Sequence, residues 1–323
     1  DQLANLFASH HSEIEFHTFI QFSCYQQLLA IKEHAKQRGI SIMGDIPILI
    51  SPESSDVWSH RALFHLDVAA GAPPDQFNKE GQYWGFPTYN WEAMEKDQFR
   101  WWQRRLQYAE HFFDLFRLDH VIGFYRIWSI PKDQLPINGA YVPKNEADFS
   151  EQGHRILSKL LGFTTMHPVG EDIGSGALPQ SISKSLASLG IDRTIILRWE
   201  QYEESKAFVP FEKYTSQSLC SLSTHDSETF AQWLRDCPEE GKKFMPLCGL
   251  PYTPDLTPEA RMKVLQVAHS LPSHLHVNLL QEYLSLFETL TWEHVEDERI
   301  NQPGMILPTN WTYRFRPSLE EIT

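Results

Sequence analysis

Apolar and polar positions change period in a regular order along the chain, which predicts helices and short strands in turn. Over 16–38 the apolar residues recur at spacings of three and four and Gly39 follows, a pattern that predicts a helix with a glycine stop. Residues 40–48 form a short, β-branched apolar run closed by Pro47 and Pro52, which predicts a buried strand. The same alternation predicts helices over 98–113, 151–161 and 179–189 and strands over 115–119, 166–170, 193–199 and 218–224. Strands and helices in this order indicate an α/β fold with a parallel sheet.

Two segments depart from this alternation. Residues 51–91 contain frequent prolines and glycines interleaved with aromatic side chains, which predicts a long aromatic loop. Long loops in compact domains are usually functional lids or disordered, and the aromatic content argues against disorder. The pattern after 227 predicts helices over 227–235, 258–269 and 274–287, and therefore a helical insertion around 227–290.

The charge balance excludes two classes of partner. The 323 residues include 28 Lys and Arg against 42 Asp and Glu, a net charge of −14, which repels the phosphates of nucleic acids and of anionic membranes. The longest apolar stretches, such as 46–50, fall far short of the roughly 20 residues that a membrane span requires. Four cysteines without a Cys-x-x-Cys pair do not form a disulfide scaffold, which favours a reducing cytoplasm.

Three of the predicted strands end in acidic residues. Asp119 lies in FRLDH, Glu171 and Asp172 lie in PVGED, and Asp226 lies in LSTHD. In parallel barrels, functional groups gather at the carboxyl ends of the strands, so we expect these carboxylates to meet in one acidic pocket. Arg117 is two residues before Asp119, on the same face of a strand, where its guanidinium would keep that carboxylate ionised. Taken singly, Asp226 could instead cap a helix and Asp172 could close a turn.

Six motifs follow one another along the chain in a distinctive order. They are GDIPI, GAPPDQFNKEGQYWGFPTYNW, FRLDHVIGFYRIW, PVGEDIG, LSTHD, and ERINQPG with NWTYR. From about residue 16 to 314 this series resembles the 4-α-glucanotransferases, also called amylomaltases or disproportionating enzymes. The resemblance implies a (β/α)8 TIM barrel of the α-amylase type. It also implies a retaining enzyme that cleaves an α-1,4-glucan bond, forms a covalent glucosyl-enzyme and transfers the glycosyl unit to another glucan or to glucose.

The resemblance also assigns roles to single positions. Asp119 would be the nucleophile, Glu171 the general acid/base and Asp226 the transition-state stabiliser. Their immediate partners would be Arg117, His120 and His225, and the residues lining the glucan site would be Asp45, Asp75, Phe77, Gln82, Trp84 and Asn301. The chemistry agrees, because a retaining enzyme needs one carboxylate to attack and a second, protonated carboxyl group to release the leaving oxygen. We therefore expect a raised pKa at Glu171, while Arg117 keeps Asp119 ionised.

The expected ligands are sugars alone. His269, His274 and His276 could suggest a metal site, but in the helix predicted over 274–287 residues two apart point in different directions. We expect no metal and no cofactor. The expected partners are α-1,4-glucans and malto-oligosaccharides, with neither nucleic acid nor membrane.

The sequence departs from the family at its beginning. Members of the family have a further N-terminal part that contributes the first two barrel strands, whereas this chain starts at Asp1 rather than at a Met. We expect 1–323 to form a partial (β/α)8 catalytic barrel of a longer enzyme, with a lid-like loop at 51–91 that excludes water during transfer. Two other functions stay open: α-glucan hydrolysis by the same acids, and non-catalytic glucan binding by a fragment.

Overall fold

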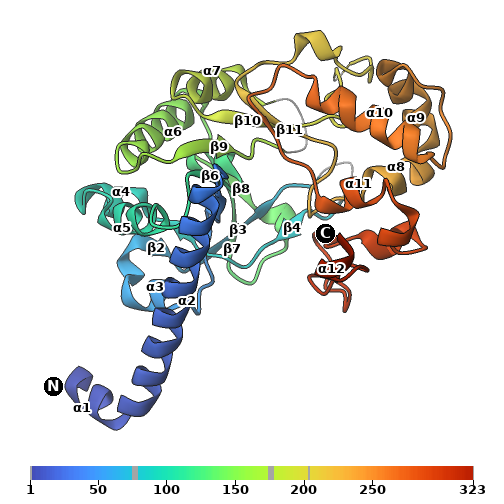
Figure 1. Ribbon diagram of the computed structural model, residues 1–323. Coiled ribbons are helices and arrows are strands. Elements are labelled where there is room, and N and C mark those ends of the chain that lie inside the picture. The colour runs from blue at the N-terminus through green and yellow to red at the C-terminus, as the bar shows by residue number, and fades with distance from the viewer. Residues whose placement is uncertain (1, 75–78, 174–177, 203, 323) are drawn as a thin grey trace.

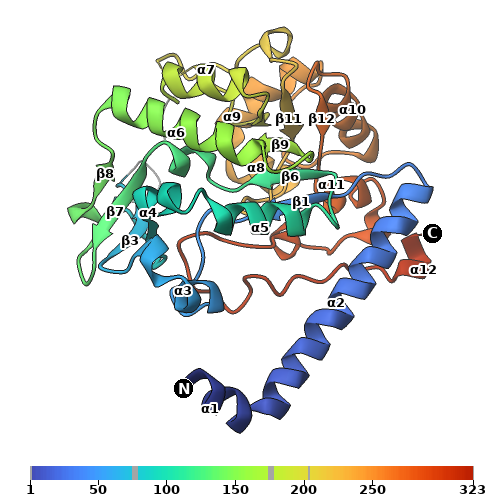
Figure 2. The ribbon, with the colours of Figure 1, turned by 90° about the vertical axis from the view of Figure 1, so that its left-hand side faces the viewer.

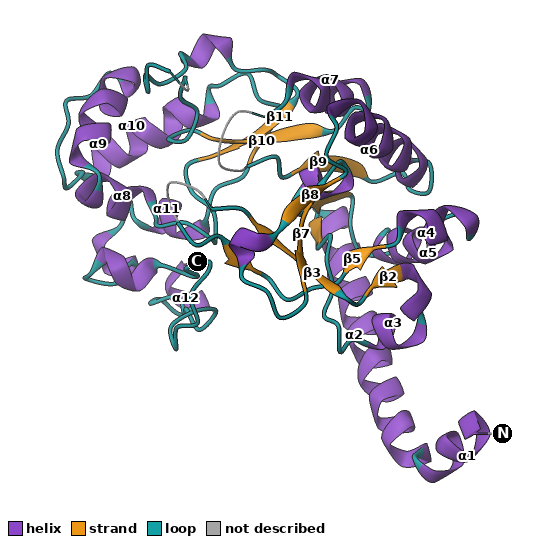
Figure 3. Cartoon of the chain, turned by 180° about the vertical axis from the view of Figure 1, so that it is seen from behind, coloured by secondary structure: helices purple, strands orange, loops and turns teal. Residues whose placement is uncertain are grey.

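A parallel sheet forms the centre of the molecule. The computed structural model describes residues 2–74, 79–173, 178–202 and 204–322. Six parallel strands lie in the order β1-β6-β9-β10-β11-β12 and curl as they cross the molecule (Figures 1 and 3). They are β1 (Met43–Ile46), β6 (Leu115–Leu118), β9 (His167–Gly170), β10 (Asp192–Ile196), β11 (Ser218–Ser221) and β12 (Leu275–His276). The five strands predicted from the apolar runs are all present, each shorter than its run.

Helices pack along the outer side of this sheet. The predicted helices appear as α5 (Arg100–Ala109), α6 (Glu146–Leu161) and α7 (Gln180–Ser188), which follow one another along the sheet in Figure 2. Their apolar faces meet the strands in a core that includes Trp102, Phe116, Leu157 and Ile182, all at most 1% exposed. Burial of large aromatic and aliphatic side chains on this scale is the main favourable free-energy term that fixes helix against sheet.

A second group of helices lies between β11 and β12. These helices are α8 (Phe230–Asp236), α9 (Pro238–Phe244) and α10 (Pro258–His269). They surround a separate apolar cluster that includes Trp233, Phe244 and Leu265. The helix predicted over 274–287 differs from the structure, which has the strand β12 and the short helix α11 (Leu280–Leu284) there. Pairing of β12 with β11, a contact between residues more than 50 positions apart, outweighs the local helical pattern.

Residues 51–91, expected to form a long loop, contain several short elements. They are α3 (Ser55–Ser59), β2 (Phe64–His65), β3 (Val68–Ala72), β4 (Gln82–Tyr83) and β5 (Thr88–Tyr89), followed by α4 (Trp91–Lys96). An antiparallel sheet in the order β4-β3-β7-β8 is completed by β7 (Ile127–Pro131) and β8 (Ala140–Val142), and β2 pairs with β5. In strands of two to five residues, the alternation of apolar and polar positions is too short to be recognised in the sequence. A Cβ at Gly71 would collide with the Gln82 carbonyl oxygen, so glycine permits the close approach of β3 and β4.

The N-terminal helices extend away from the rest of the molecule. Helix α1 (Gln2–Ser9) lies at the far end of α2 (His11–Gln37), as all three ribbon views show. The helix predicted over 16–38 is therefore confirmed, but its apolar residues Phe16 and Phe19 are exposed. Nearer its end, Tyr25 packs edge-on against Phe112. Of the helices in the described ranges, none combines the length and apolar character that a membrane span requires.

The remaining elements are short. A four-residue helix, α12 (Leu319–Ile322), lies near the end of the chain. The 3-10 helices are η1 (Arg61–Leu63), η2 (Val121–Phe124), η3 (Pro136–Asn138), η4 (Phe211–Lys213), η5 (Met245–Cys248), η6 (Glu288–Leu290) and η7 (Val295–Glu298).

Candidate functional site

The site begins where β1 and β6 lie side by side. The register of these parallel strands pairs Asp45 with Arg117. Nη1 of Arg117 donates to both carboxylate oxygens of Asp45, at 2.9 and 2.8 Å. Residues paired across neighbouring strands point to the same face, so the register alone brings these two side chains together.

Arg117 also contacts the two acids that follow β6 and β9. Its Nη1 is 3.1 Å from Oδ1 of Asp119, which confirms that residues two apart share this face, and its Nη2 is 2.7 Å from Oε1 of Glu171. The backbone N–H of His120 donates to Oε2 of Glu171 at 2.8 Å. One half-buried guanidinium therefore joins three carboxylates from three neighbouring strands.

The pKa of Asp119 is set by several neighbours besides Arg117. Burial and the charge of Glu171 raise the pKa of Asp119, and a hydrogen bond with Glu171 adds to this, while Arg117 and His120 oppose it. Arg117 favours the ionised form of Asp119, as the spacing predicts, but burial and the charge of Glu171 outweigh it. Burial lowers the pKa of His120 to about 4, so this imidazole is neutral near pH 7.

The third acid lies on the loop between β11 and α8. Nε2 of His225 is 3.3 Å from Oδ2 of Asp226, and Nδ2 of Asn301 donates to Oδ1 of Asp226 at 2.6 Å. Burial would raise the pKa of Asp226, but these two hydrogen bonds and the positive charge of Arg117 outweigh it and lower the pKa. The hydrogen bond to Asp226 raises the pKa of His225. Asp226 is not a helix cap, since the Thr229 side chain caps α8.

An aromatic side chain that directly follows β4 of the small antiparallel sheet reaches the same region. The Trp84 ring meets the His120 ring edge-on, with centroids 5.0 Å apart, and its Nε1 donates to Oε1 of Gln82 at 3.1 Å. Gly81 and Gly85 flank the segment with φ values of +77° and +79°, a conformation that glycine adopts without strain. Of the expected glucan-lining residues, Asp45 and Asn301 thus contact Arg117 and Asp226, while Trp84 meets His120 and Gln82 bonds to Trp84.

Two expected site residues, Asp75 and Phe77, lie outside the described residues. Asp172, which directly follows Glu171, is buried and accepts hydrogen bonds from Arg193 and from the backbone of Thr194. These partners lie on β10, so Asp172 ties the segment after β9 to the neighbouring strand rather than closing a local turn. Within the described ranges, no three or more His, Cys, Asp or Glu side chains are grouped so that they could bind a metal ion.

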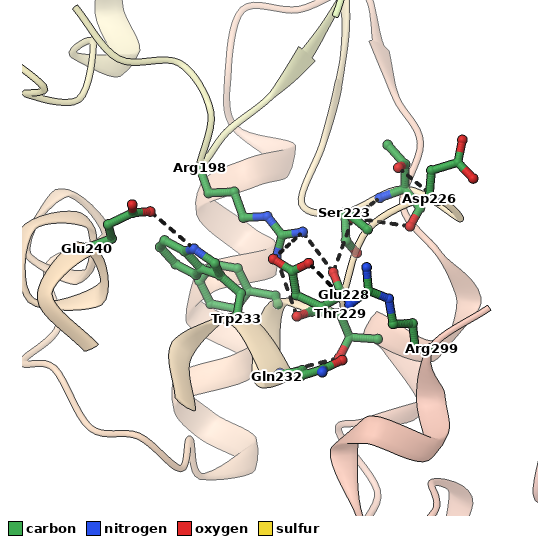
Figure 4. A network of polar contacts seen from close by, with 12 residues as sticks. Arg198, Ser223, Asp226, Glu228, Thr229, Gln232, Trp233, Glu240 and Arg299 are labelled. Atoms are coloured by element: carbon green, nitrogen blue, oxygen red, sulfur yellow. Dashed lines mark hydrogen bonds and ion pairs between the residues drawn. The ribbon is translucent and has the colours of Figure 1, made fainter. Parts of the chain in front are cut away.

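Sequence reasoning did not single out several residues that border the site. Trp311 has a φ of +60° and places its ring 5.5 Å from that of His225. Trp311 belongs to the NWTYR motif, and this motif is the sequence signal that could have identified it. Behind Asp226, Glu228 lies between the guanidinium groups of Arg198 and Arg299 (Figure 4). Nothing in the local pattern marks these three charges, because they come from three distant segments.

The parallel strands carry acids at their carboxyl ends, around one shared arginine. This arrangement defines a protein of the (β/α)-barrel class, in which catalytic side chains lie at the carboxyl ends of the strands. The sequence pattern of the family described as 4-alpha-glucanotransferase matches residues 1–320. The chain belongs to this family.

Individual relatives agree with this assignment. The chain is 44% identical over 313 residues to a 4-alpha-glucanotransferase of Chlamydia pneumoniae, which covers 97% of this chain and 59% of the relative. The corresponding protein of Chlamydia muridarum is 42% identical, with 96% of this chain and 58% of the relative covered. The chain thus spans less than two thirds of the length of these relatives.

A solved structure shows the same fold. An amylomaltase from Streptococcus agalactiae in complex with acarbose superimposes with a TM-score of 0.81 and 26% identity, covering 100% of this chain and 62% of that one. The fold class expected from the sequence, an α/β chain that forms an incomplete (β/α)8 barrel, is confirmed.

Proposed function

We propose that this chain carries the catalytic acids of a retaining 4-α-glucanotransferase. The arrangement that supports the proposal is the contact of Arg117 with both Asp119 and Glu171, together with Asp226 under the charge of the same arginine. Family membership and the acarbose bound by the S. agalactiae amylomaltase favour an α-glucan as the ligand. The donors and acceptors would be α-1,4-glucans and malto-oligosaccharides.

In the first half of the reaction, an Asp119 carboxylate oxygen attacks the anomeric carbon of the donor. The bond from that carbon to the glycosidic oxygen breaks, and Glu171 gives its proton to the departing oxygen. In the second half, the hydroxyl group of an acceptor sugar attacks the same carbon and gives its proton to Glu171, which releases Asp119. The reaction requires an ionised Asp119 and a proton on Glu171 at its start.

The other residues are assigned to binding. Asp226, ionised by its partners, would stabilise the positive charge that develops on the sugar ring, and His225 would share that contact. His120 and Arg117 would orient the two reacting carboxyl groups. Asp45, Asp75, Phe77, Gln82, Trp84 and Asn301 would line the glucan site.

The segment 51–91 is proposed to act as a lid that excludes water, so that a sugar rather than water resolves the glycosyl-enzyme. This segment would belong to one partial barrel of 1–323, with the helices around 227–290 as an insertion. A cytoplasmic location is proposed because Cys24, Cys220, Cys237 and Cys248 are free thiols, which a reducing compartment maintains.

Maltotriose tests the proposal directly. The chain is incubated with this sugar and the products are separated: longer and shorter oligomers indicate transfer, whereas glucose and maltose alone indicate hydrolysis. Asp119→Asn should reduce the rate by about a thousandfold or more. The matched control is Asp255→Asn, which removes an exposed carboxylate paired with Arg235. Binding of the sugar without any new product would support a non-catalytic glucan-binding chain instead.

A further inference from the structure

The loop that carries His225 and Asp226 is fixed at both ends by the segment that follows β12, from Asn278 into helix α11. The backbone N–H of Leu222 donates to Oδ1 of Asn278 at 2.8 Å. The buried carboxylate of Glu282 accepts hydrogen bonds from the hydroxyl of Ser223 and from the backbone N–H of Phe230. These contacts fix the ends of the loop but do not touch the Asp226 carboxylate.

A buried arginine fixes the other side of the loop. Arg198 follows β10, and its side chain is fully buried. Its Nη2 donates to the Glu228 carbonyl oxygen at 2.8 Å, and its Nη1 donates to the Thr229 carbonyl oxygen at 3.4 Å (Figure 4). Nη2 also lies 3.4 Å from Oε1 of Glu228. A buried guanidinium needs a nearby negative charge, and the Glu228 carboxylate provides it here.

The same carboxylate is connected to Asp226 through a second arginine. Nη1 of Arg299 lies 3.9 Å from Oε2 of Glu228, and Nε of Arg299 donates to the Asn301 carbonyl oxygen at 3.1 Å. The Asn301 side chain then donates to Asp226 at 2.6 Å. The contacts therefore run without interruption from Arg198 to Asp226.

We propose that Glu228, bound between Arg198 and Arg299, is a positioning residue that fixes Asn301 and, through it, the orientation of Asp226. The effect of Glu228 on catalysis rests on the proposed function. Glu228 pairs with the two arginines behind the loop, whereas the Asp226 carboxylate contacts His225 and Asn301, so Glu228 acts on the reaction only through these neighbours. Without the Glu228 charge, Arg299 loses the partner that orients it toward Asn301.

Titration of His225 by NMR tests this inference in the ligand-free protein. Its imidazole reports on Asp226, whose hydrogen bond raises the His225 pKa, while Arg117 and Asp45 also act on it electrostatically. Glu228→Gln preserves the side-chain volume and removes the charge. Arg299→Gln removes the donor to Asn301. In both variants we expect the pKa of His225 to fall toward its ordinary value, because Asp226 is no longer oriented toward the imidazole.

The matched control is Arg235→Gln, which breaks an arginine–carboxylate pair with Asp255 at the surface and leaves His225 as in the wild type. Circular dichroism identifies variants that do not fold. If Glu228→Gln does not fold, Arg299→Gln decides the question, since its guanidinium is not part of the buried anchor. An unchanged His225 pKa in a folded variant of either kind would overturn the inference.

Kinetics with maltotriose separate this inference from the proposed function. In an active enzyme, Glu228→Gln should lower kcat by roughly 10- to 100-fold with little change in KM, as expected for a misplaced charge that acts in the transition state. The acid limb of the pH profile should move to higher pH, because a weaker Asn301 contact favours protonated Asp226. A wild-type chain without transfer activity would count against the proposed function, while the His225 titration would still decide the role of Glu228.

Discussion

The partly buried imidazole of His120 should make the protein sensitive to mild acid. Burial lowers its pKa from 6.5 to about 4 in the folded state, whereas the unfolded chain exposes an ordinary histidine. Between these two values the unfolded state binds the proton and the folded state does not. The stability that His120 contributes is therefore fully present above pH 6.5 and is lost as the pH falls toward 4.

The size of this effect follows from the two pKa values. Linkage gives a loss of about 2 kcal/mol in the free energy of unfolding between pH 7 and pH 5 from this one group. The variant His120→Asn removes the titration. It suits the site because residue 120 has a φ of +45°, a conformation that asparagine tolerates better than most residues. The loss of the edge-on contact with Trp84 lowers stability equally at both pH values and cancels in the comparison.

Urea unfolding at pH 7 and pH 5, followed by circular dichroism, measures the effect. The wild type should lose about 2 kcal/mol more than His120→Asn over this interval. His34→Asn is the matched control, because it replaces an exposed imidazole whose bond is to Arg38, the residue that directly follows the same helix. Equal losses in the wild type and in His120→Asn would refute the reasoning and would mean that the imidazole takes up a proton in the folded state.

Three further predictions concern catalysis and packing. Glu171→Gln should slow transfer from maltotriose by about a thousandfold but affect an α-glucosyl fluoride much less, because fluoride leaves without a proton; equal losses would argue against the acid role. Trp84→Ala should raise the ratio of released glucose to elongated product, whereas an unchanged ratio with a lower melting temperature would indicate packing alone. Gly153→Ala should destabilise α6 by about 1–3 kcal/mol, since overlap of the new Cβ with the Tyr125 ring outweighs a helix-propensity gain of about 1 kcal/mol. Thermal melts test the Gly153 prediction, with Gly162→Ala as the control because a Cβ at that position has room. A Gly153→Ala protein as stable as the wild type would contradict the prediction.

The sequence predicted the elements whose pattern is long and local. The helices now seen as α2, α6 and α10 and the strands β6 and β10 were readable because their apolar period or composition persists over several residues. The short strands β3 and β7 were not, because an antiparallel pair of this length is stabilised by cross-strand bonds that no local pattern records. The helix predicted over 274–287 is wrong at its start for the same reason, because pairing with β11 makes that part the strand β12.

By itself the sequence determined the acids and their order, since Asp119, Glu171 and Asp226 each follow an apolar run, and it determined the family through its motifs. Only the tertiary structure decided the electrostatics. Burial and the neighbouring Glu171 raise the pKa of Asp119, although Arg117 lowers it as its spacing had suggested. Spacing along a strand shows which side chains share a face, but a pKa depends on every charge that burial brings within reach, including those from distant segments.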